Sequence, residues 1–185
     1  MPNFNSQIIT ITLLSSTLFL SACNQKSNEN SNEISATDQV IQELSSQPIK
    51  PFEKTANDLH DIQLLIDYDA RYTAVSEELE DELAKMKDAG TLTAEFAYDR
   101  KHDSILSALE MLKHLDLKTQ QGRYIQGLLA NYWETQSKWI DSHKAEANKG
   151  TQVTDDTLTS VKDFLQAQEQ LEYWRNQYPE LDSQK

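Results

Sequence analysis

The stretch ANDLHDIQLLIDYDARYTAVSEELEDELAKMKDAG, residues 56–90, decides the fold of this chain. Its apolar residues recur every three or four positions, which is the spacing of one face of an α-helix. Gly90 supplies a C-terminal stop, because glycine readily takes the left-handed conformation that ends many helices. The sequence therefore predicts a long helix from 56 to 88, whose apolar face consists of Leu65, Tyr68, Tyr72, Val75, Leu79, Leu83 and Met86.

Three further segments downstream show the same helical period. Thr93 is an N-cap for a helix that reaches 115, a third helix covers 117–148 before Gly150, and a fourth covers 154–178 before Pro179. Long helices joined by short connections are expected to lie antiparallel. We therefore predict an all-α domain over residues 55–185, folded as an antiparallel up-down four-helix bundle. Only four glycines and four prolines occur in the chain, which also disfavours a β-sandwich.

The region before the bundle has a different character. Residues 24–33 read NQKSNENSNE, without any apolar period, and Pro48 and Pro51 interrupt the chain further on. Such a segment buries too little apolar surface to offset its ordering entropy. We predict a flexible N-terminal tether over residues 23–54.

The N-terminus carries an apolar run from Ile8 to Leu20, followed by Leu20-Ser21-Ala22-Cys23. The run is too short to span a bilayer as a helix, which needs about 20 apolar residues, but it suits a signal-peptide core. Leu20-Ser21-Ala22-Cys23 resembles the lipobox of bacterial lipoproteins. One departure is that no Lys or Arg precedes the run, so only the amino terminus is positive there. The alternative is a secreted protein with a cysteine at this place by chance.

The lipoprotein resemblance implies a set of properties for the N-terminus. Residues 1–22 would be the signal peptide, removed before Cys23, and Cys23 would carry a diacylglycerol and, on its new amine, a further acyl chain such as palmitate. Several acyl chains give stable membrane anchoring. Asn24 stands where inner-membrane lipoproteins of enteric bacteria typically carry Asp, so the resemblance favours the outer membrane, with the domain in the periplasm or at the cell surface.

Charge points to the kind of partner. The formal net charge is −13, which disfavours nucleic acid and anionic lipid head groups as ligands. Between residues 55 and 90, ten acids stand against three bases, a net of −7. We interpret the run Glu77, Glu78, Glu80, Asp81 and Glu82 as a docking face for a basic protein, with a solvated helix face as the plain alternative.

Aromatic residues give a second candidate surface. Folding the chain at its predicted turns places Tyr72, Trp174 and Tyr178 within one or two helical turns of one another. Tyr and Trp are common anchors in protein interfaces, although they also close the ends of helical cores. We therefore predict these three as anchors for a partner and keep the core position as the alternative.

The sequence offers no candidate catalytic residue, metal site or cofactor. The four histidines fall at separate heights of the predicted bundle, and His102, on the apolar face of the second helix, is interpreted as a core or boundary residue. Cys23 is the only cysteine, which excludes an internal disulfide and a cysteine metal site. The expected function is a non-enzymatic protein-binding module, such as an inhibitor or immunity protein for a basic partner. The alternative is an accessory or structural subunit of a cell-envelope assembly.

Overall fold

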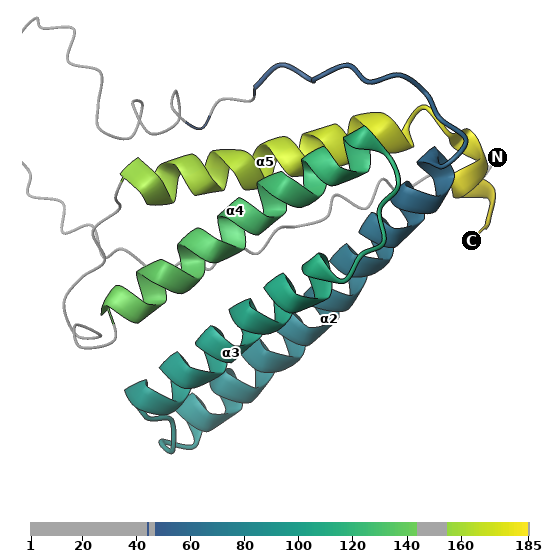
Figure 1. Cartoon of the computed structure of the whole chain (residues 1–185). Coiled ribbons are helices and arrows are strands. Elements are labelled where there is room, and N and C mark those ends of the chain that lie inside the picture. The colour runs from purple at the N-terminus through teal and green to yellow at the C-terminus, as the bar shows by residue number, and fades with distance from the viewer. Residues whose placement is uncertain (1–43, 45–46, 144–154, 185) are drawn as a thin grey trace, which may run out of the picture. The chain divides into compact units, whose positions relative to one another are not determined.

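The computed structural model describes residues 44, 47–143 and 155–184, which all belong to one compact unit, Ile34–Lys185. Four helices follow one another in antiparallel order (Figure 1), and a short 3-10 helix ends the described chain. No strand occurs within these ranges. The prediction of an all-α four-helix bundle is confirmed. The elements are α2 (Asp58–Asp88), α3 (Ala94–Lys113), α4 (Gln120–His143), α5 (Asp155–Arg175) and η2 (Pro179–Gln184).

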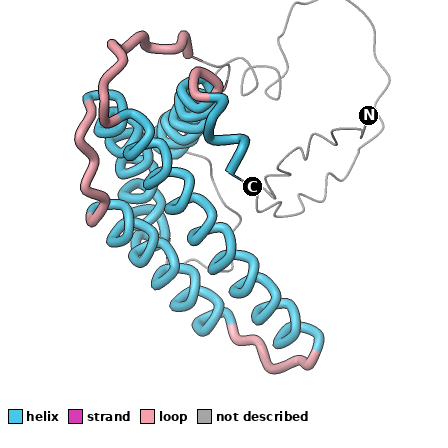
Figure 2. The backbone as a smooth tube through the Cα atoms, turned by 90° about the vertical axis from the view of Figure 1, so that its right-hand side faces the viewer, coloured by secondary structure: helices cyan, strands magenta, loops and turns pink. Residues whose placement is uncertain are grey.

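The loop between α2 and α3 is set by its sequence. Gly90 has a φ of +67° and donates its N–H to the carbonyl of Lys87, while Thr91 donates to the carbonyl of Met86. These two bonds are the Schellman arrangement that closes a helix C-terminus. Thr93 caps the next helix by accepting the N–H of Phe96 at 3.1 Å. The two caps hold the short loop that Figure 2 shows between the paired helices.

Two predicted helix ends are displaced. The third helix begins at Gln120 rather than 117, because residues 117–119 form part of the connection from α3. The fourth ends at Arg175, where the N–H groups of Gln177 and Tyr178 bond three residues back and tighten the chain before η2. The predicted end at 148 and start at 154 lie outside the described residues.

The core is concentrated toward one end of the bundle. Its members are Ile62, Leu65 and Tyr68 in α2, Ala108, Leu109 and Leu112 in α3, Leu117 in the following loop, Ile125, Leu129 and Trp133 in α4, and Ala167 and Trp174 in α5. In α2 these residues occupy the first third of the helix, with Leu83 the exception beyond them. The later part of α2 therefore pairs with α3 but contributes little to the common core.

Residues 47–54, which the sequence placed in the flexible tether, lie against the bundle. The segment is extended, and its main chain at Lys50 bonds twice to the side chain of Gln170 in α5. Phe52 packs on Tyr124 of α4, with ring centroids 5.5 Å apart. The folded domain therefore begins upstream of residue 55, and we call residues 47–54 the strap.

The predicted signal peptide 1–22, Cys23 and most of the predicted tether lie outside the described residues. Within the described ranges, none of the helices combines the length and apolarity that crossing a membrane requires.

Candidate functional site

The acidic run of α2 is largely open to solvent. Glu77, Glu78, Glu80 and Asp81 are exposed, and Glu82 is half-buried. Glu82 accepts a hydrogen bond from the guanidinium of Arg100 in α3 at 2.9 Å. Among the described residues, the other four carboxylates form no ion pair. We call these five residues the acidic face.

The acidic face lies beyond the main core. It follows Tyr68, the last buried residue in the first part of α2, by more than two helical turns. The side chains that point inward there are Leu79, Leu83 and Met86, of which Leu83 alone is buried. The acidic side chains are therefore presented on a stretch whose packing does not depend on them.

Trp174 was predicted as a surface anchor, and this prediction is wrong. The residue is 1 % exposed and belongs to the core, and its indole N–H points at the carboxylate of Asp58 at 3.4 Å. A residue covered on all sides cannot reach a partner. The alternative interpretation, an aromatic residue that closes one end of the core, describes Trp174 correctly. The aromatic that is exposed on α5 is its neighbour Tyr173, at 49 %.

Tyr72 and Tyr178 are half-buried, and the predicted aromatic cluster does not form. Tyr72 packs on Trp133, with ring centroids 4.6 Å apart, whereas Tyr178 donates its hydroxyl to Asp58. Asp58 and Tyr72 are separated by 14 positions of α2, about 21 Å along the helix. Tyr178 and Trp174 are thus remote from the acidic face, and of the three only Tyr72 lies near it.

The level of Tyr72 relative to α4 is set at the start of α4. The carboxylate of Asp61 accepts the main-chain N–H groups of Lys118, at 2.9 and 3.0 Å, and of Thr119, at 2.7 Å. These bonds fix the beginning of α4 level with the first turn of α2. Tyr72, three turns along α2, therefore meets Trp133 rather than the beginning of α4.

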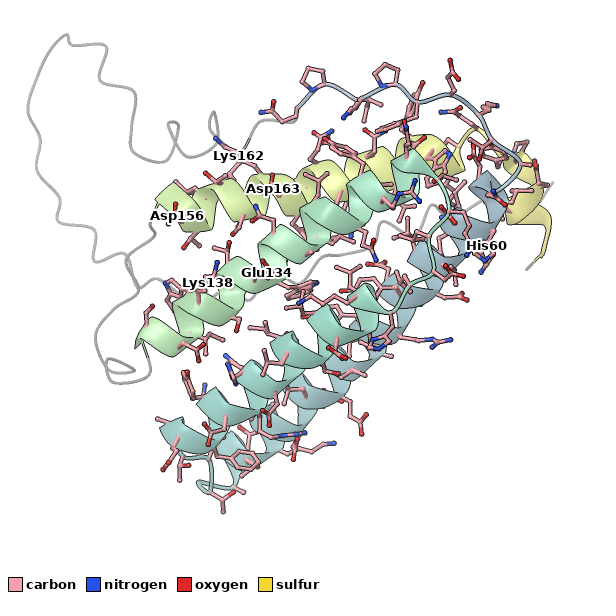
Figure 3. All side chains as sticks on the ribbon, viewed as in Figure 1. His60, Glu134, Lys138, Asp156, Lys162 and Asp163 are labelled. Atoms are coloured by element: carbon pink, nitrogen blue, oxygen red, sulfur yellow. The ribbon has the colours of Figure 1, made fainter. Side chains whose placement is uncertain are left out.

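Asp61 is fully buried and well supplied with donors. Besides the two main-chain groups, the imidazole Nδ1 of His60 lies 3.0 Å from its Oδ1. Figure 3 shows His60 at the outer edge of the start of α2. Burial by itself would raise the pKa of Asp61, but the hydrogen bonds from His60, Lys118 and Thr119 outweigh it and hold the pKa below its usual value. The carboxylate is therefore ionised in the folded protein at neutral pH.

Asp58, one turn earlier on the same face, joins α2 to the C-terminal end of α5. It accepts the hydroxyl of Tyr178 at 2.5 Å and the hydroxyl of Thr55 at 2.6 Å. Burial acts to raise the pKa of Asp58, and the bonds from Thr55, Tyr178 and Trp174 lower it below the usual value. Burial and the bond to Asp58 together raise the pKa of Tyr178 to about 12.

The hydrogen bonds of these two buried carboxylates tie the start of α2 to the start of α4 and to the end of α5. Sequence reasoning did not single them out, because acidic residues in a first helical turn are common on purely electrostatic grounds. The sequence feature linked to Asp61 is the glycine at position 122. It packs directly against Asp61, and a Cβ there would come within 2.6 Å of the Asp61 Oδ2.

His102 lies on the face of α3 that meets α4. His102 is half-buried on α3, stacks on Tyr98, and has its Nε2 3.2 Å from a carboxylate oxygen of Asp141 in α4. It thus lies at the boundary between α3 and α4, which is one of the two positions expected for it, and its partner is a carboxylate. In the described part of the chain, no three His, Cys, Asp or Glu residues gather closely enough to hold a metal ion.

Compared with protein-family models, with curated proteins and with solved structures, the chain shows no match. Its function must therefore be argued from its own residues.

Proposed function

We propose that this protein is a lipid-anchored, non-enzymatic binding protein of the bacterial cell envelope that docks a basic protein on the acidic face of α2. The anchor would be Cys23, by resemblance of Leu20-Ser21-Ala22-Cys23 to the lipobox. The outer membrane is the favoured location, with the bundle in the periplasm or at the surface. An inhibitor or immunity protein that neutralises a basic enzyme is the role that fits this chemistry.

The observation that carries the proposal is the exposure of four carboxylates on one short stretch without ion pairs in the described chain. Within the run, Glu77–Glu80, Glu77–Asp81, Glu78–Asp81 and Glu78–Glu82 stand three or four positions apart. Like charges at such spacing destabilise a helix by roughly 0.2–0.5 kcal/mol a pair. The four pairs together cost α2 about 1–2 kcal/mol, which a cationic surface placed against them would relieve.

Charge of this kind also matters at long range. A local cluster of one sign raises the rate at which an oppositely charged partner arrives more than it raises the final affinity. Across the α2–α3 contact, one ion pair reaches the acidic face within the described residues, that between Arg100 and Glu82. A basic partner is therefore favoured over a neutral one.

The experiment compares three forms of residues 24–185, which contain the whole compact unit, as bait for envelope and secreted proteins of the producing cell. The first is the unmodified chain. The second neutralises the acidic face with E77Q, E78Q, E80Q, D81N and E82Q. The third removes the same five charges from exposed acids elsewhere, with E53Q, E95Q, D103N, E110Q and D156N.

We expect one basic protein to bind the first and third forms and to be lost from the second. Release by about 0.3 M salt supports docking through charge, since the screening length is then only a few ångström. Equal capture by the second form would eliminate the acidic face as the docking surface. Capture of membrane-embedded subunits that resist salt would instead support the alternative role, an accessory or structural part of an envelope assembly.

A further inference from the structure

The strap is held by two glutamines that point at its main chain. Gln170 of α5 is fully buried, accepts the N–H of Lys50 at 3.0 Å and donates its Nε2–H to the carbonyl of the same residue at 2.8 Å. One side-chain amide thus satisfies both main-chain groups of one strap residue. The strap contributes only main-chain atoms to this pairing, so the pairing does not depend on the strap's side chains.

Gln166 repeats the arrangement one helical turn earlier, but incompletely. It is 4 % exposed, and its Nε2 reaches the carbonyl of Pro48 at 3.4 Å. Its Oε1 is buried and has no hydrogen-bond partner among the described residues. The strap residue opposite it is a proline, which has no N–H to give. The site therefore offers an acceptor that the strap at this position leaves unused.

The spacing of the two amides matches an extended chain. Four residues of a helix advance by about 6.0 Å, and two residues of an extended chain advance by about 6.6 Å. Gln166 and Gln170 are four apart and meet Pro48 and Lys50, which are two apart, so the strap runs parallel to α5 with one contact a turn. Figure 1 shows this parallel course above α5. Buried glutamines at this interval form a surface that binds extended main chain.

The strap buries Gln166 and Gln170 but leaves most of its own residues open to solvent. Within it only Ile49 and Phe52 are even half-buried, and the other six residues are exposed. The ammonium of Lys50 lies 4.6 Å from the ring centroid of Tyr124. Beside the strap, a surface depression of about 490 Å3 is lined by its first residues together with Glu169, Glu172, Tyr173 and Asn176. Carboxylates and aromatic rings next to the two amides favour a cationic chain.

We propose that the face formed by Gln166 and Gln170 is a main-chain-binding groove that the strap occupies in cis. In trans it accepts an extended, basic segment of a partner protein. Such a segment forms the two bonds to Gln170, places a Lys or Arg near Tyr124, and supplies to Gln166 the N–H that Pro48 lacks. The groove lies on α5 and does not depend on the acidic face of α2.

The test uses residues 24–185 and, as the probe, the peptide QAIKPFEK, which copies residues 47–54 with alanine in place of Pro48 and therefore carries the N–H that Gln166 can accept. In the variant Lys50→Pro the cis strap loses the N–H that Gln170 accepts, while the groove itself is unchanged. We expect the peptide to bind this variant, and to bind the unmodified chain at least about tenfold more weakly, because a tethered strap competes at millimolar effective concentration. Adding Gln170→Ala to the variant should weaken peptide binding about tenfold.

Equal binding with and without Gln170→Ala, in proteins whose circular dichroism shows the same helix content, would overturn the proposal. Absence of binding to a folded Lys50→Pro chain would do the same. Hydrogen exchange of the unmodified chain is an independent check that needs no variant. The Lys50 amide should exchange much faster than that of Leu129 in the core, because the strap can detach from α5 without unfolding of the bundle. Equal protection of the two amides would contradict a releasable strap.

Discussion

Replacing Asp61 by alanine should destabilise the protein strongly, because one carboxylate holds the start of α4. The substitution leaves the N–H groups of Lys118 and Thr119 without their acceptor. An unsatisfied buried donor costs about 1–3 kcal/mol, and water can reach the part-buried Lys118 group more easily than the buried Thr119 group. We therefore expect the free energy of unfolding to fall by about 2–4 kcal/mol.

Urea unfolding measures this change, followed by far-ultraviolet circular dichroism and by tryptophan fluorescence. The matched control is Asp67→Ala on the same helix. Among the described residues Asp67 accepts a hydrogen bond from the exposed Gln63, so we expect this substitution to cost less than about 0.5 kcal/mol. Asp61→Asn should fall between the two, because it keeps one oxygen for the main-chain donors. If Asp61→Ala and Asp67→Ala unfolded at the same urea concentration with the same slope, Asp61 would not hold α4 in place.

Three further predictions concern the same end of the bundle. Gly122→Ala should lower the unfolding free energy by roughly 1–3 kcal/mol, because the new Cβ would meet Asp61 Oδ2 at 2.6 Å. Gly127→Ala has open space around it and should instead raise the unfolding free energy by up to about 1 kcal/mol through helix propensity. Thermal unfolding compares the two variants, and equal shifts in melting temperature would refute the close approach of Gly122 to Asp61. The pKa values of Asp58 and Asp61 are lowered in the fold, so the stability that these carboxylates supply is complete above about pH 4 and is lost as the pH falls through their folded pKa values. Unfolding free energies measured from pH 6 to 2 should therefore decline more steeply in the unmodified chain than in Asp61→Ala. Burial raises the pKa of Asp69, so Asp69→Asn should stabilise the protein at pH 7, with a gain that shrinks as the pH falls through that raised value; a loss of stability at pH 7 would show that the charge is favourable there.

The helices themselves could be predicted from local sequence. The apolar period of α2, the stop at Gly90 and the cap at Thr93 are all decided within a few residues, and the structure reproduces each of them. The fold class follows because long amphipathic helices with short connections have few ways to cover their apolar faces. Local rules of this kind require no knowledge of which helices touch.

The register between helices could not be predicted, because it depends on a contact between residues 57 positions apart. Asp61 fixes the beginning of α4, and that single connection decides which residues of α2 and α4 lie at the same height. Likewise, the bonds of Trp174 and Tyr178 to Asp58 place these two residues at the start of α2, 14 positions from Tyr72. Trp174, by contrast, lies on the same helical row as the buried Ala167 and Gln170, so the period of α5 already favours a covered position for Trp174 over Tyr173.

The strap was missed for a related reason. Ile49 and Phe52 are its only apolar residues and form no helical or strand period, and its bonds to Gln170 are made through main-chain atoms, which leave no trace in side-chain patterning. The corresponding signal is on α5, where Gln166 and Gln170 stand one helical turn apart. Glutamines at that interval are equally compatible with a solvated face, so the sequence alone could not distinguish the two.

Docking of a basic protein on the acidic face is tested most directly by the association rate constant of the captured partner, measured from low salt to about 0.5 M. For the unmodified chain and for the control form lacking five other acids, the rate should be high at low salt and fall steeply as salt rises. Neutralising the acidic face should lower the low-salt rate by about tenfold or more and flatten its salt dependence. A rate and a salt slope unchanged by the five substitutions would contradict docking at this face.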